Sequence, residues 1–393
     1  MNKEYLCIND KIIFETKGST PKYVDESTTI VLNQKCVRNG MIDYSFTQYV
    51  SDKQNIANEK YVKIGDVLLN STGQGTAGRC AFVDQIPENY KVTVDSHMLI
   101  LRFEHIELAR FFAYSLFNKE NFILELLTGS SGQGELDREI VYNISFPFDD
   151  KNLKIFNKIL LAINNKIKLN NKINKELENL AKTLYEYWFV QFDFPDENKR
   201  PYKSSGGAMV YNEILKREIP INFEIKYVKD FLDVVTGKED ANFSDEKGQY
   251  AFFTCGDEIL KCNQPVFNGK SILIAGNGNF NIKYFEGKFN AYQRTYVLIP
   301  NDDLFVGTIY LSALNRINAL TKGSSGSIVK FITKRDVENI PVIVPKNRTL
   351  LRFFNKLLDK QNHIRSENQQ LVKLRDFLLP MLMNGQIGII SEQ

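Results

Sequence analysis

The two halves of this 393-residue chain repeat each other. Four stretches of the first half recur in the same order in the second, at offsets that drift between 194 and 204 residues. They are IGDVLLNSTGQG (64–75) and NGKSILIAGNGN (268–279), Gly-Ser-Ser (129–131 and 323–325), NISFPF (143–148) and NIPVIVP (339–345), and IFNKIL (155–160) and FFNKLL (353–358). A period near 200 residues is far longer than the repeats of solenoid proteins, which are roughly 20–45 residues. The chain is therefore predicted to consist of one large unit copied twice.

Each copy begins with a region rich in short apolar runs that are bounded by Gly, Asn and Asp, which is the pattern of β-strands. These runs are 67–72, 79–84 and 98–103 in the first copy and 249–255, 271–276 and 295–300 in the second. Each copy then ends in a long helical segment. The sequence thus predicts the same order, a mixed region followed by a long helix, twice.

Both helical segments carry an apolar seam with 3-4 spacing, which is typical of helices that pack on a partner. In the first the seam is Leu153, Phe156, Leu160, Ile163, Ile167, Leu177, Leu184 and Trp188, with polar Asn170 and Asn174 at its centre. In the second it is Leu350, Phe354, Leu357, Ile364, Leu371 and Leu378, with polar Gln361 and Asn368, and Pro380 and Gly385 are predicted to end the helix. Neither helix can bury its seam alone, so we expect the two to pack on each other in antiparallel orientation.

The predicted fold class is therefore α+β. It comprises two duplicated mixed α/β domains, joined by two long helices packed as an antiparallel coiled coil, with pseudo-two-fold symmetry. The expected boundaries are a first domain at 1–149, a central helix at 150–190, a linker at 191–220, a second domain at 221–345 and a C-terminal helix at 346–387. The linker is predicted from the density of Pro, Gly, Ser and charge in 192–209.

The net charge of +3 is unevenly distributed. Residues 151–189 and 346–387 each carry a net charge of +5, and the rest of the chain carries −7. Two basic helical segments are compatible with nucleic-acid binding, and equally with two solvated helix faces.

Common catalytic and cofactor motifs are missing. Gly73 to Gly78 matches G-x-G-x-x-G, but a further strand follows instead of a helix, so we interpret it as a glycine-rich hairpin loop. Three widely spaced histidines and five scattered cysteines form no zinc pattern. No apolar run reaches the ~20 residues of a membrane helix, and the sequence MNKEYLCINDK lacks the apolar stretch expected of a signal peptide. The sequence therefore predicts a cytoplasmic, non-catalytic protein without a metal or cofactor of its own.

Polar, glycine-rich loops recur in both copies and supply the residue types that read base edges and hold phosphates. The candidate DNA-binding residues are Ser71, Thr72, Gln74, Thr76, Arg79, Ser96, His97, Ser130 and Ser131 in the first copy, and Asn277, Asn279, Tyr292, Gln293, Arg294, Ser324 and Ser325 in the second. The same residue types also form turns, so the alternative for each is a purely structural role.

Four stretches strongly resemble the specificity subunit of Type I restriction–modification enzymes, and the resemblance covers nearly the whole chain. They are LTGSSGQGELDREIVYNISFPF, LAKTLYEYWFVQFDFP, KSSGGAMVYNEILKREIP and LRDFLLPMLMNGQI. The resemblance implies two target-recognition domains, each reading one half of a split site in double-stranded DNA, and two helices that fix the gap between the halves. It also implies docking of two modification subunits, which bind S-adenosylmethionine and methylate adenine. Restriction subunits that use ATP and Mg²⁺ are further partners in that family.

Two other functions are compatible with the same architecture. One is a protein-assembly scaffold with two binding domains on a coiled coil and no DNA readout. The other is a standalone enzyme with an unfamiliar site around Arg79 or His97.

Overall fold

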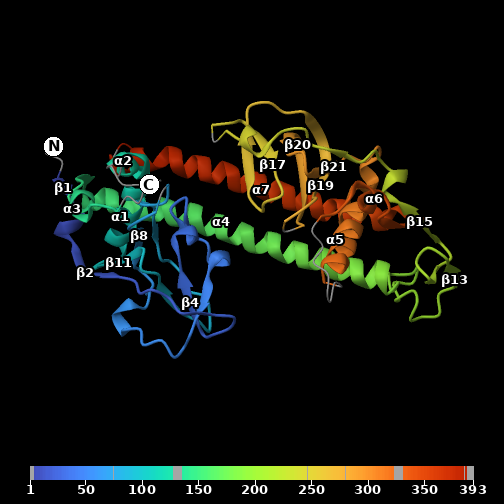
Figure 1. Cartoon of the computed structure of the whole chain (residues 1–393), viewed down its shortest axis with the longest axis horizontal. Helices are drawn as coiled ribbons and strands as arrows, with labels where there is room; N and C mark the ends of the chain where they lie inside the picture. The colour runs from blue at the N-terminus through green and yellow to red at the C-terminus, as the bar shows by residue number, and fades with distance from the viewer. Residues whose placement is uncertain are drawn as a thin grey trace, which may run out of the picture. The chain divides into compact units, whose positions relative to one another are not determined.

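The computed structural model describes residues 4–73, 75–126, 135–245, 247–278, 280–322, 331–384 and 386 (Figure 1). The chain divides into two compact units. Unit 1 comprises Met1–Ile167 and Gln369–Gln393, and unit 2 comprises Lys168–Asn368. Each unit therefore contains one mixed region together with parts of both long helices, and unit 1 is built from two separate stretches of chain.

Unit 1 contains two four-stranded sheets, ordered β2-β11-β8-β9 and β10-β4-β7-β3, and the strand pairs β1–β12 and β5–β6. The strands are β1 (Glu4–Leu6), β2 (Ile12–Lys17), β3 (Tyr23–Val24), β4 (Thr29–Leu32), β5 (Val37–Arg38), β6 (Met41–Ile42), β7 (Gln48–Val50), β8 (Val67–Asn70), β9 (Cys80–Phe82), β10 (Lys91–Val94), β11 (Met98–Phe103) and β12 (Phe146–Phe148). Three α-helices complete the region before α4: α1 (Ile106–Asn118), α2 (Glu120–Leu126) and α3 (Arg138–Tyr142).

Strand β8 lies at the centre of unit 1 because both of its faces are apolar. Leu69 belongs to the core that includes Phe112 of α1, and Leu68, on the opposite face, belongs to a second core that includes Ile30 and Val92. All four residues of the strand are buried. A continuous apolar run is the pattern of a strand covered on both sides.

Unit 2 is built around one six-stranded sheet, ordered β16-β21-β19-β20-β17-β18, with the pairs β13–β14 and β15–β22. The strands are β13 (Met209–Asn212), β14 (Arg217–Pro220), β15 (Phe223–Tyr227), β16 (Val235–Thr236), β17 (Tyr250–Phe253), β18 (Ile259–Cys262), β19 (Phe267–Ala275), β20 (Ile282–Ala291), β21 (Thr295–Leu298) and β22 (Pro341–Pro345). Its helices before α7 are α5 (Val306–Lys322) and α6 (Lys334–Glu338).

The duplication predicted from sequence is confirmed by the topology. The strand order β2-β11-β8-β9 of unit 1 recurs as β16-β21-β19-β20 in unit 2. In both units a strand near the start of the mixed region pairs in antiparallel orientation with the strand before the long helix, as β1–β12 and β15–β22. The α+β fold class is confirmed as well.

The long helices are α4 (Asp150–Tyr185), which continues into the π-helical turn η5 (Glu186–Val190), and α7 (Arg348–Met383). Phe156 and Leu160 of α4 are buried with Leu379 and Leu382 of α7 in the core of unit 1. In unit 2, Trp188 packs on Phe353 and Phe354, at ring-centroid distances of 5.1 and 5.7 Å. The apolar seams thus pack on each other within each unit, as predicted.

The polar seam residues meet in unit 2 and show that the helices are antiparallel there. Asn170 Nδ2 donates hydrogen bonds to Glu367 Oε2 and to Asn368 Oδ1, both at 2.8 Å. Four residues further along α4, the Asn174 carbonyl accepts a bond from Gln361 Nε2 at 3.3 Å. Numbers rise along α4 while they fall along α7, as the sequence predicts.

An asparagine at the same place in the two repeated motifs attaches each mixed region to its helix. Asn157 Nδ2 donates to the Glu107 carbonyl at 3.3 Å, near the start of α1. Asn355 Oδ1 accepts from the Gly307 amide at 2.8 Å, in the first turn of α5. The Gly307 amide lies in the first turn of α5, where amide groups lack intrahelical partners, and Asn355 satisfies it.

Two expectations are corrected by the structure. Pro380 does not end α7, which continues to Met383, because proline removes one amide donor and the amide of Asn384 still bonds the Pro380 carbonyl at 3.1 Å. The segment predicted as a linker carries the β13–β14 hairpin, and its Phe192 and Phe194 are buried in the core of unit 2. Composition indicated turns, and the aromatic residues between them supply the packing.

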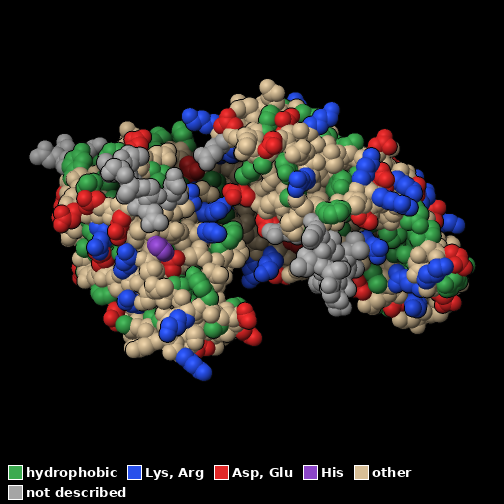
Figure 2. All heavy atoms as spheres, in the orientation of Figure 1, with side chains coloured by type: hydrophobic (Ala, Val, Ile, Leu, Met, Phe, Trp, Pro, Cys, Tyr) green, Lys and Arg blue, Asp and Glu red, His purple; other side chains and the backbone are tan. Residues whose placement is uncertain are grey.

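In the described part of the chain, no helix is both long and apolar enough to cross a membrane. On the face seen in Figure 2, Lys and Arg side chains are interspersed with Asp and Glu, and no single-sign field covers the mixed regions.

Candidate nucleic-acid interface

The strand registers align the two units residue by residue at one end of the sheet. In unit 1, Met98 of β11 lies opposite Asn70 of β8, and in unit 2 Thr295 of β21 lies opposite Ala275 of β19. The parallel pairs β10–β4 and β20–β17 align in the same way, at Val94↔Leu32 and Ala291↔Phe253. We call the loops that follow β4, β8 and β10 edge 1, and those that follow β17, β19 and β20 edge 2.

The backbone hydrogen bonds of edge 1 recur at edge 2, at lengths that agree within 0.4 Å. The amide-to-carbonyl pairs are Ser71→His97 (2.8 Å) and Gly276→Arg294 (2.9 Å), Asp95→Leu32 (3.0 Å) and Tyr292→Phe253 (2.8 Å), Met98→Asp95 (3.2 Å) and Thr295→Tyr292 (2.8 Å), and Leu136→Ser71 (2.8 Å) and Ile332→Gly276 (2.8 Å). The loops of edge 1 and edge 2 thus share a pattern of backbone hydrogen bonds although their sequences differ.

A glycine at the equivalent place lets a chain segment approach each edge closely. A Cβ on Gly18 would lie 2.0 Å from the Asp95 carbonyl oxygen, and one on Gly237 would lie 1.9 Å from the Ala291 carbonyl oxygen. Neither backbone oxygen can yield to a side chain, so only glycine fits. The segment after β2 therefore packs directly against the backbone of edge 1, and the segment after β16 packs directly against the backbone of edge 2.

At edge 1 the structure brings together Thr72 and His97, which are 25 residues apart in sequence. Thr72 Oγ1 lies 2.7 Å from Nδ1 of His97. The imidazole is exposed, and the backbone amide of His97 donates to Asp95 Oδ1 at 2.9 Å, which fixes the backbone of the turn. Burial raises the pKa of the Asp95 carboxyl. Ser71 is buried and bonds the His97 carbonyl, so its role is to hold the turn rather than to face solvent.

The glycine-rich segment 71–79 is a hairpin loop between the antiparallel strands β8 and β9, as expected. Thr76 Oγ1 is buried in it. Arg79 follows the loop, and its Nε forms an ion pair of 3.2 Å with Glu120 of α2. Burial raises the pKa of Glu120 and the Arg79 charge lowers it, in that order of size. Ser96 is half-buried in the turn before His97.

At edge 2, the predicted residues Asn277, Tyr292, Gln293 and Arg294 lie on two loops joined by the bond from Gly276 to Arg294. Gln293 and Arg294 are exposed, and Asn277 and Tyr292 are half-buried. By the strand registers, Asn277 corresponds to Thr72 and Arg294 to His97. The two edges thus present an alcohol and an imidazole in one unit and an amide and a guanidinium in the other.

Six predicted residues lie outside the described part of the chain: Gln74, Ser130, Ser131, Asn279, Ser324 and Ser325. Beyond the Gly-Ser-Ser stretches, the described chain resumes at Glu135 and Phe331 and contacts the edges there. Glu135 forms a β-bridge with Thr72, Leu136 bonds Ser71, and Ile332 bonds Gly276.

Sequence reasoning missed a third loop at each edge, the one that follows β4 or β17. Asn70 Nδ2 donates to the Gln34 carbonyl at 3.2 Å, and Asn281 Nδ2 donates to the Cys255 carbonyl at 3.0 Å. Gln34 and Cys255 are equivalent by strand register. No motif marks these loops, and only the parallel pairing of β4 with β10 and of β17 with β20 could have located them.

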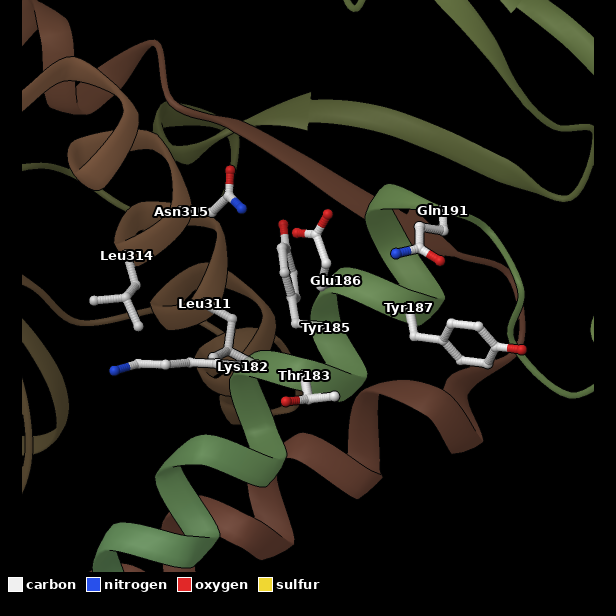
Figure 3. A pocket seen from close by; sticks show the side chains of 9 residues that line it. All are labelled: Lys182, Thr183, Tyr185, Glu186, Tyr187, Gln191, Leu311, Leu314 and Asn315. Carbon is white, nitrogen blue, oxygen red and sulfur yellow. The ribbon is translucent and has the colours of Figure 1, made fainter. Parts of the chain in front are cut away.

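A cavity of about 480 Å³ lies elsewhere in unit 2, between the end of α4 and α5 (Figure 3). It is lined by Lys182, Thr183, Tyr185, Glu186, Tyr187, Gln191, Leu311, Leu314 and Asn315, none of which is a predicted site residue. The described residues also contain no group of three or more His, Cys, Asp or Glu side chains placed to hold a metal ion.

Comparison with known proteins identifies the family. The model of the Type I restriction modification DNA specificity domain matches residues 7–179 and 220–373, once in each half. The EcoDI specificity subunit of Escherichia coli is 35% identical over 179 residues, which cover 43% of this chain and 40% of that protein. The chain thus spans less than half of the E. coli relative in that alignment.

Other relatives match over longer stretches. The HindI specificity subunit of Haemophilus influenzae is 23% identical, covering 84% of this chain and 88% of that protein. The crystal structure of an S subunit from M. genitalium covers 100% of this chain and 97% of its own, with 16% identity and a TM-score of 0.47. Since the family model matches most of the sequence, once per repeat, this chain belongs to the Type I restriction–modification DNA specificity family, with two specificity domains.

Proposed function

We propose that the chain is the non-catalytic subunit that selects the DNA site of a Type I restriction–modification complex. Edge 1 reads one half of a bipartite site in double-stranded DNA and edge 2 reads the other. Helices α4 and α7 set the gap between the halves and dock the modification subunits. S-adenosylmethionine, ATP and Mg²⁺ act only in partner subunits.

The observation that carries this proposal is the pair of equivalent edges. Their backbones share four hydrogen bonds, while their side chains differ at the same positions, as Thr72 and His97 against Asn277 and Arg294. A duplicated frame with different side chains is what two different half-sites require.

The side chains at the edges have the chemistry of base readout. An asparagine amide matches the donor and acceptor on the major-groove side of adenine, and an arginine guanidinium matches the two acceptors of guanine. Each good pair of this kind contributes about 1–3 kcal/mol of discrimination against a wrong base. Hydroxyl groups such as that of Thr72 are compatible with bases and phosphates alike.

Phosphate contacts need positive charge, and the mixed regions are on balance acidic. The basic residues of α4 include Lys154, Lys158 and Lys172, which are exposed. We assign the sequence-independent part of DNA affinity to these helices and to partner subunits, and the sequence-dependent part to the edges.

Two single substitutions test the proposal. His97→Ala is expected to relax the base preference in one half of the methylated site, and Arg294→Ala in the other, each by about 1–3 kcal/mol at one position. The measurement is the methylated motif in DNA of cells that express the chain with its methyltransferase subunit, read by modification-sensitive sequencing.

Each variant carries its own control, because the untouched half and the gap should keep the wild-type sequence. The proposal that each edge recognises one half-site would be contradicted if one substitution changed both halves of the motif. It would also be contradicted if neither substitution changed either half. A wild-type chain that yields no bipartite methylation with an active methyltransferase would point instead to an assembly scaffold.

A further inference from the structure

The loop that follows β4 places the side chain of Gln34 at edge 1, although no sequence motif marks this residue. Gln34 begins the 3₁₀ turn η2 (Gln34–Cys36), whose preceding residue Asn33 caps it by accepting the Lys35 amide at 2.9 Å. Asn33 Nδ2 also donates to the Phe46 carbonyl at 3.1 Å, and Asn70 Nδ2 holds the Gln34 carbonyl. The backbone of Gln34 is therefore fixed from two sides.

The Gln34 side chain extends over the glycine-rich loop of edge 1. Its Nε2 donates to the carbonyl oxygen of Thr72, and lies 3.2 Å from Thr72 Oγ1, which itself contacts His97. A Cβ on Gly73 would lie 2.7 Å from Gln34 Nε2 and 2.4 Å from Thr76 Oγ1. Gly73 has φ +109°, so a side chain there would be both crowded and strained.

The carboxamide of Gln34 keeps hydrogen-bonding capacity for an outside partner. It is half-buried, and no described residue donates a hydrogen bond to its Oε1. Nε2 donates to the carbonyl oxygen and to Oγ1 of Thr72, which orients the amide plane and leaves Oε1 as the open acceptor. An oriented amide oxygen can accept a hydrogen bond from the exocyclic amino group on the major-groove edge of adenine or cytosine.

The equivalent position of unit 2 has different chemistry on the same backbone. Cys255 stands there, and its Sγ is 3.3 Å from the Arg294 carbonyl, to which it donates. A thiol sulfur is only a weak hydrogen-bond acceptor, unlike the amide oxygen of Gln34. The backbone at this position is the same in the two domains, whereas the hydrogen-bonding groups of the side chain differ. Such a position is suited to determining the DNA sequence that each domain selects.

We propose that Gln34 is a specificity-determining residue of the first domain, reading a base edge beside Thr72 and His97. This inference rests on the proposed function. The competing role is purely structural: Gln34 would hold the Thr72–Gly73 turn, and its loss would weaken the domain without changing the sequence it selects.

Two substitutions separate these roles. Gln34→Ala removes donor and acceptor, and should lower discrimination at one base of the first half-site about ten-fold or more. Gln34→Arg retains donors that can reach Thr72 but has no acceptor, and should move the preference at that base toward guanine. Lys35→Ala, an exposed neighbour in the same turn, is the matched control and should leave the motif unchanged.

The measurement is the methylated motif produced by each variant with the methyltransferase subunit, together with the melting temperature of the purified variant. A wild-type motif from both Gln34 variants, at whatever level of methylation, would overturn the inference and leave the proposed function intact. A wild-type protein that produces no bipartite motif would overturn both, so the two failures are distinguishable.

Discussion

Asp95 supports the turn that presents His97, and the residue is 7% exposed. Burial raises its pKa, so the folded state holds the Asp95 proton more tightly than the unfolded chain does. Ionised Asp95 therefore lowers the free energy of unfolding at neutral pH. This destabilisation disappears as the pH falls through the folded pKa towards the unfolded value near ~3.9.

Asp95→Asn keeps a side-chain acceptor for the His97 amide and removes the charge. We expect the variant to melt at a higher temperature than the wild type at pH 7, and the difference to shrink as the pH approaches ~4. Melting curves at several pH values measure this. Asp25→Asn, at an exposed position of the same unit, is the control, and an equal shift for Asp95→Asn at every pH would contradict the argument.

At the level of residues, sequence analysis could select polar types but not partners. His97 and Arg294 follow from residue chemistry and from the repeat. The contact between Thr72 and His97, and the place of Gln34, depend on strands β4, β8 and β11 meeting at one end, and no local pattern encodes that pairing. Arg79 has the expected chemistry, and only the fold reveals that Glu120 pairs with it.

At the level of elements, the polar residues in the α4–α7 seam form a connected layer. Asn170 is 1% exposed and donates to two side chains of α7, and Asn368 Nδ2 donates to Asn171 Oδ1 at 2.7 Å. Such a layer specifies which residues face each other, since any shift of one helix would leave buried polar atoms without partners.

Asn170→Ala should therefore lower the free energy of unfolding by about 1–3 kcal/mol, the range for stranding buried hydrogen-bonding groups. Chemical denaturation of the purified chain measures this. Lys172→Ala, at an exposed position two residues along the same helix, should change it by less than ~0.5 kcal/mol. Equal stability of the wild type and Asn170→Ala would show that the layer does not hold the helices in place.

The two long helices were the most predictable elements, because an apolar seam repeated over 36 residues is compatible with few structures other than a helix. The residues at which these helices end were harder to predict. Pro380 lies inside α7, since the lost amide bond affects only the preceding turn. The hairpin β13–β14 was hidden because Pro, Gly and Ser are counted as breakers, whereas the packing of Phe192 and Phe194 depends on contacts with residues far along the chain.

At the level of the whole molecule, the division between units falls inside both long helices, at Ile167/Lys168 in α4 and Asn368/Gln369 in α7. The duplication itself was predictable from the motifs. The place of the division was not, because it depends on which part of each helix a mixed region covers.

Because the division falls at one place in each helix, matched insertions there test whether the helices set the spacing of the site. Seven residues inserted after Ile167, with seven more after Asn368, add about two turns, or ~10 Å, to each helix and nearly preserve the helix faces. At ~3.4 Å per base pair, the gap in the methylated motif should grow by about three base pairs.

Both half-sites should keep their sequence in this double insertion. Insertion in α4 alone should instead shift Phe156 of α4 along α7, away from Leu379 and Leu382, and lower the stability of unit 1. If the variant with both insertions is active and the gap in its methylated motif is unchanged, the two helices do not set the spacing of the site.

The interrupted composition of unit 1 also determines when the chain can finish folding. Its core includes Leu379, Leu382 and Met383, which follow the whole of unit 2 in the sequence. During synthesis unit 1 begins to emerge before unit 2, yet its apolar surface beside Phe156 stays uncovered until the part of α7 that follows unit 2 has been translated. Unit 2 is one continuous stretch and can close earlier. Unit 1 is thus begun before unit 2 and completed after it, and a stop codon before Leu379 would damage the recognition domain that precedes unit 2 in the sequence.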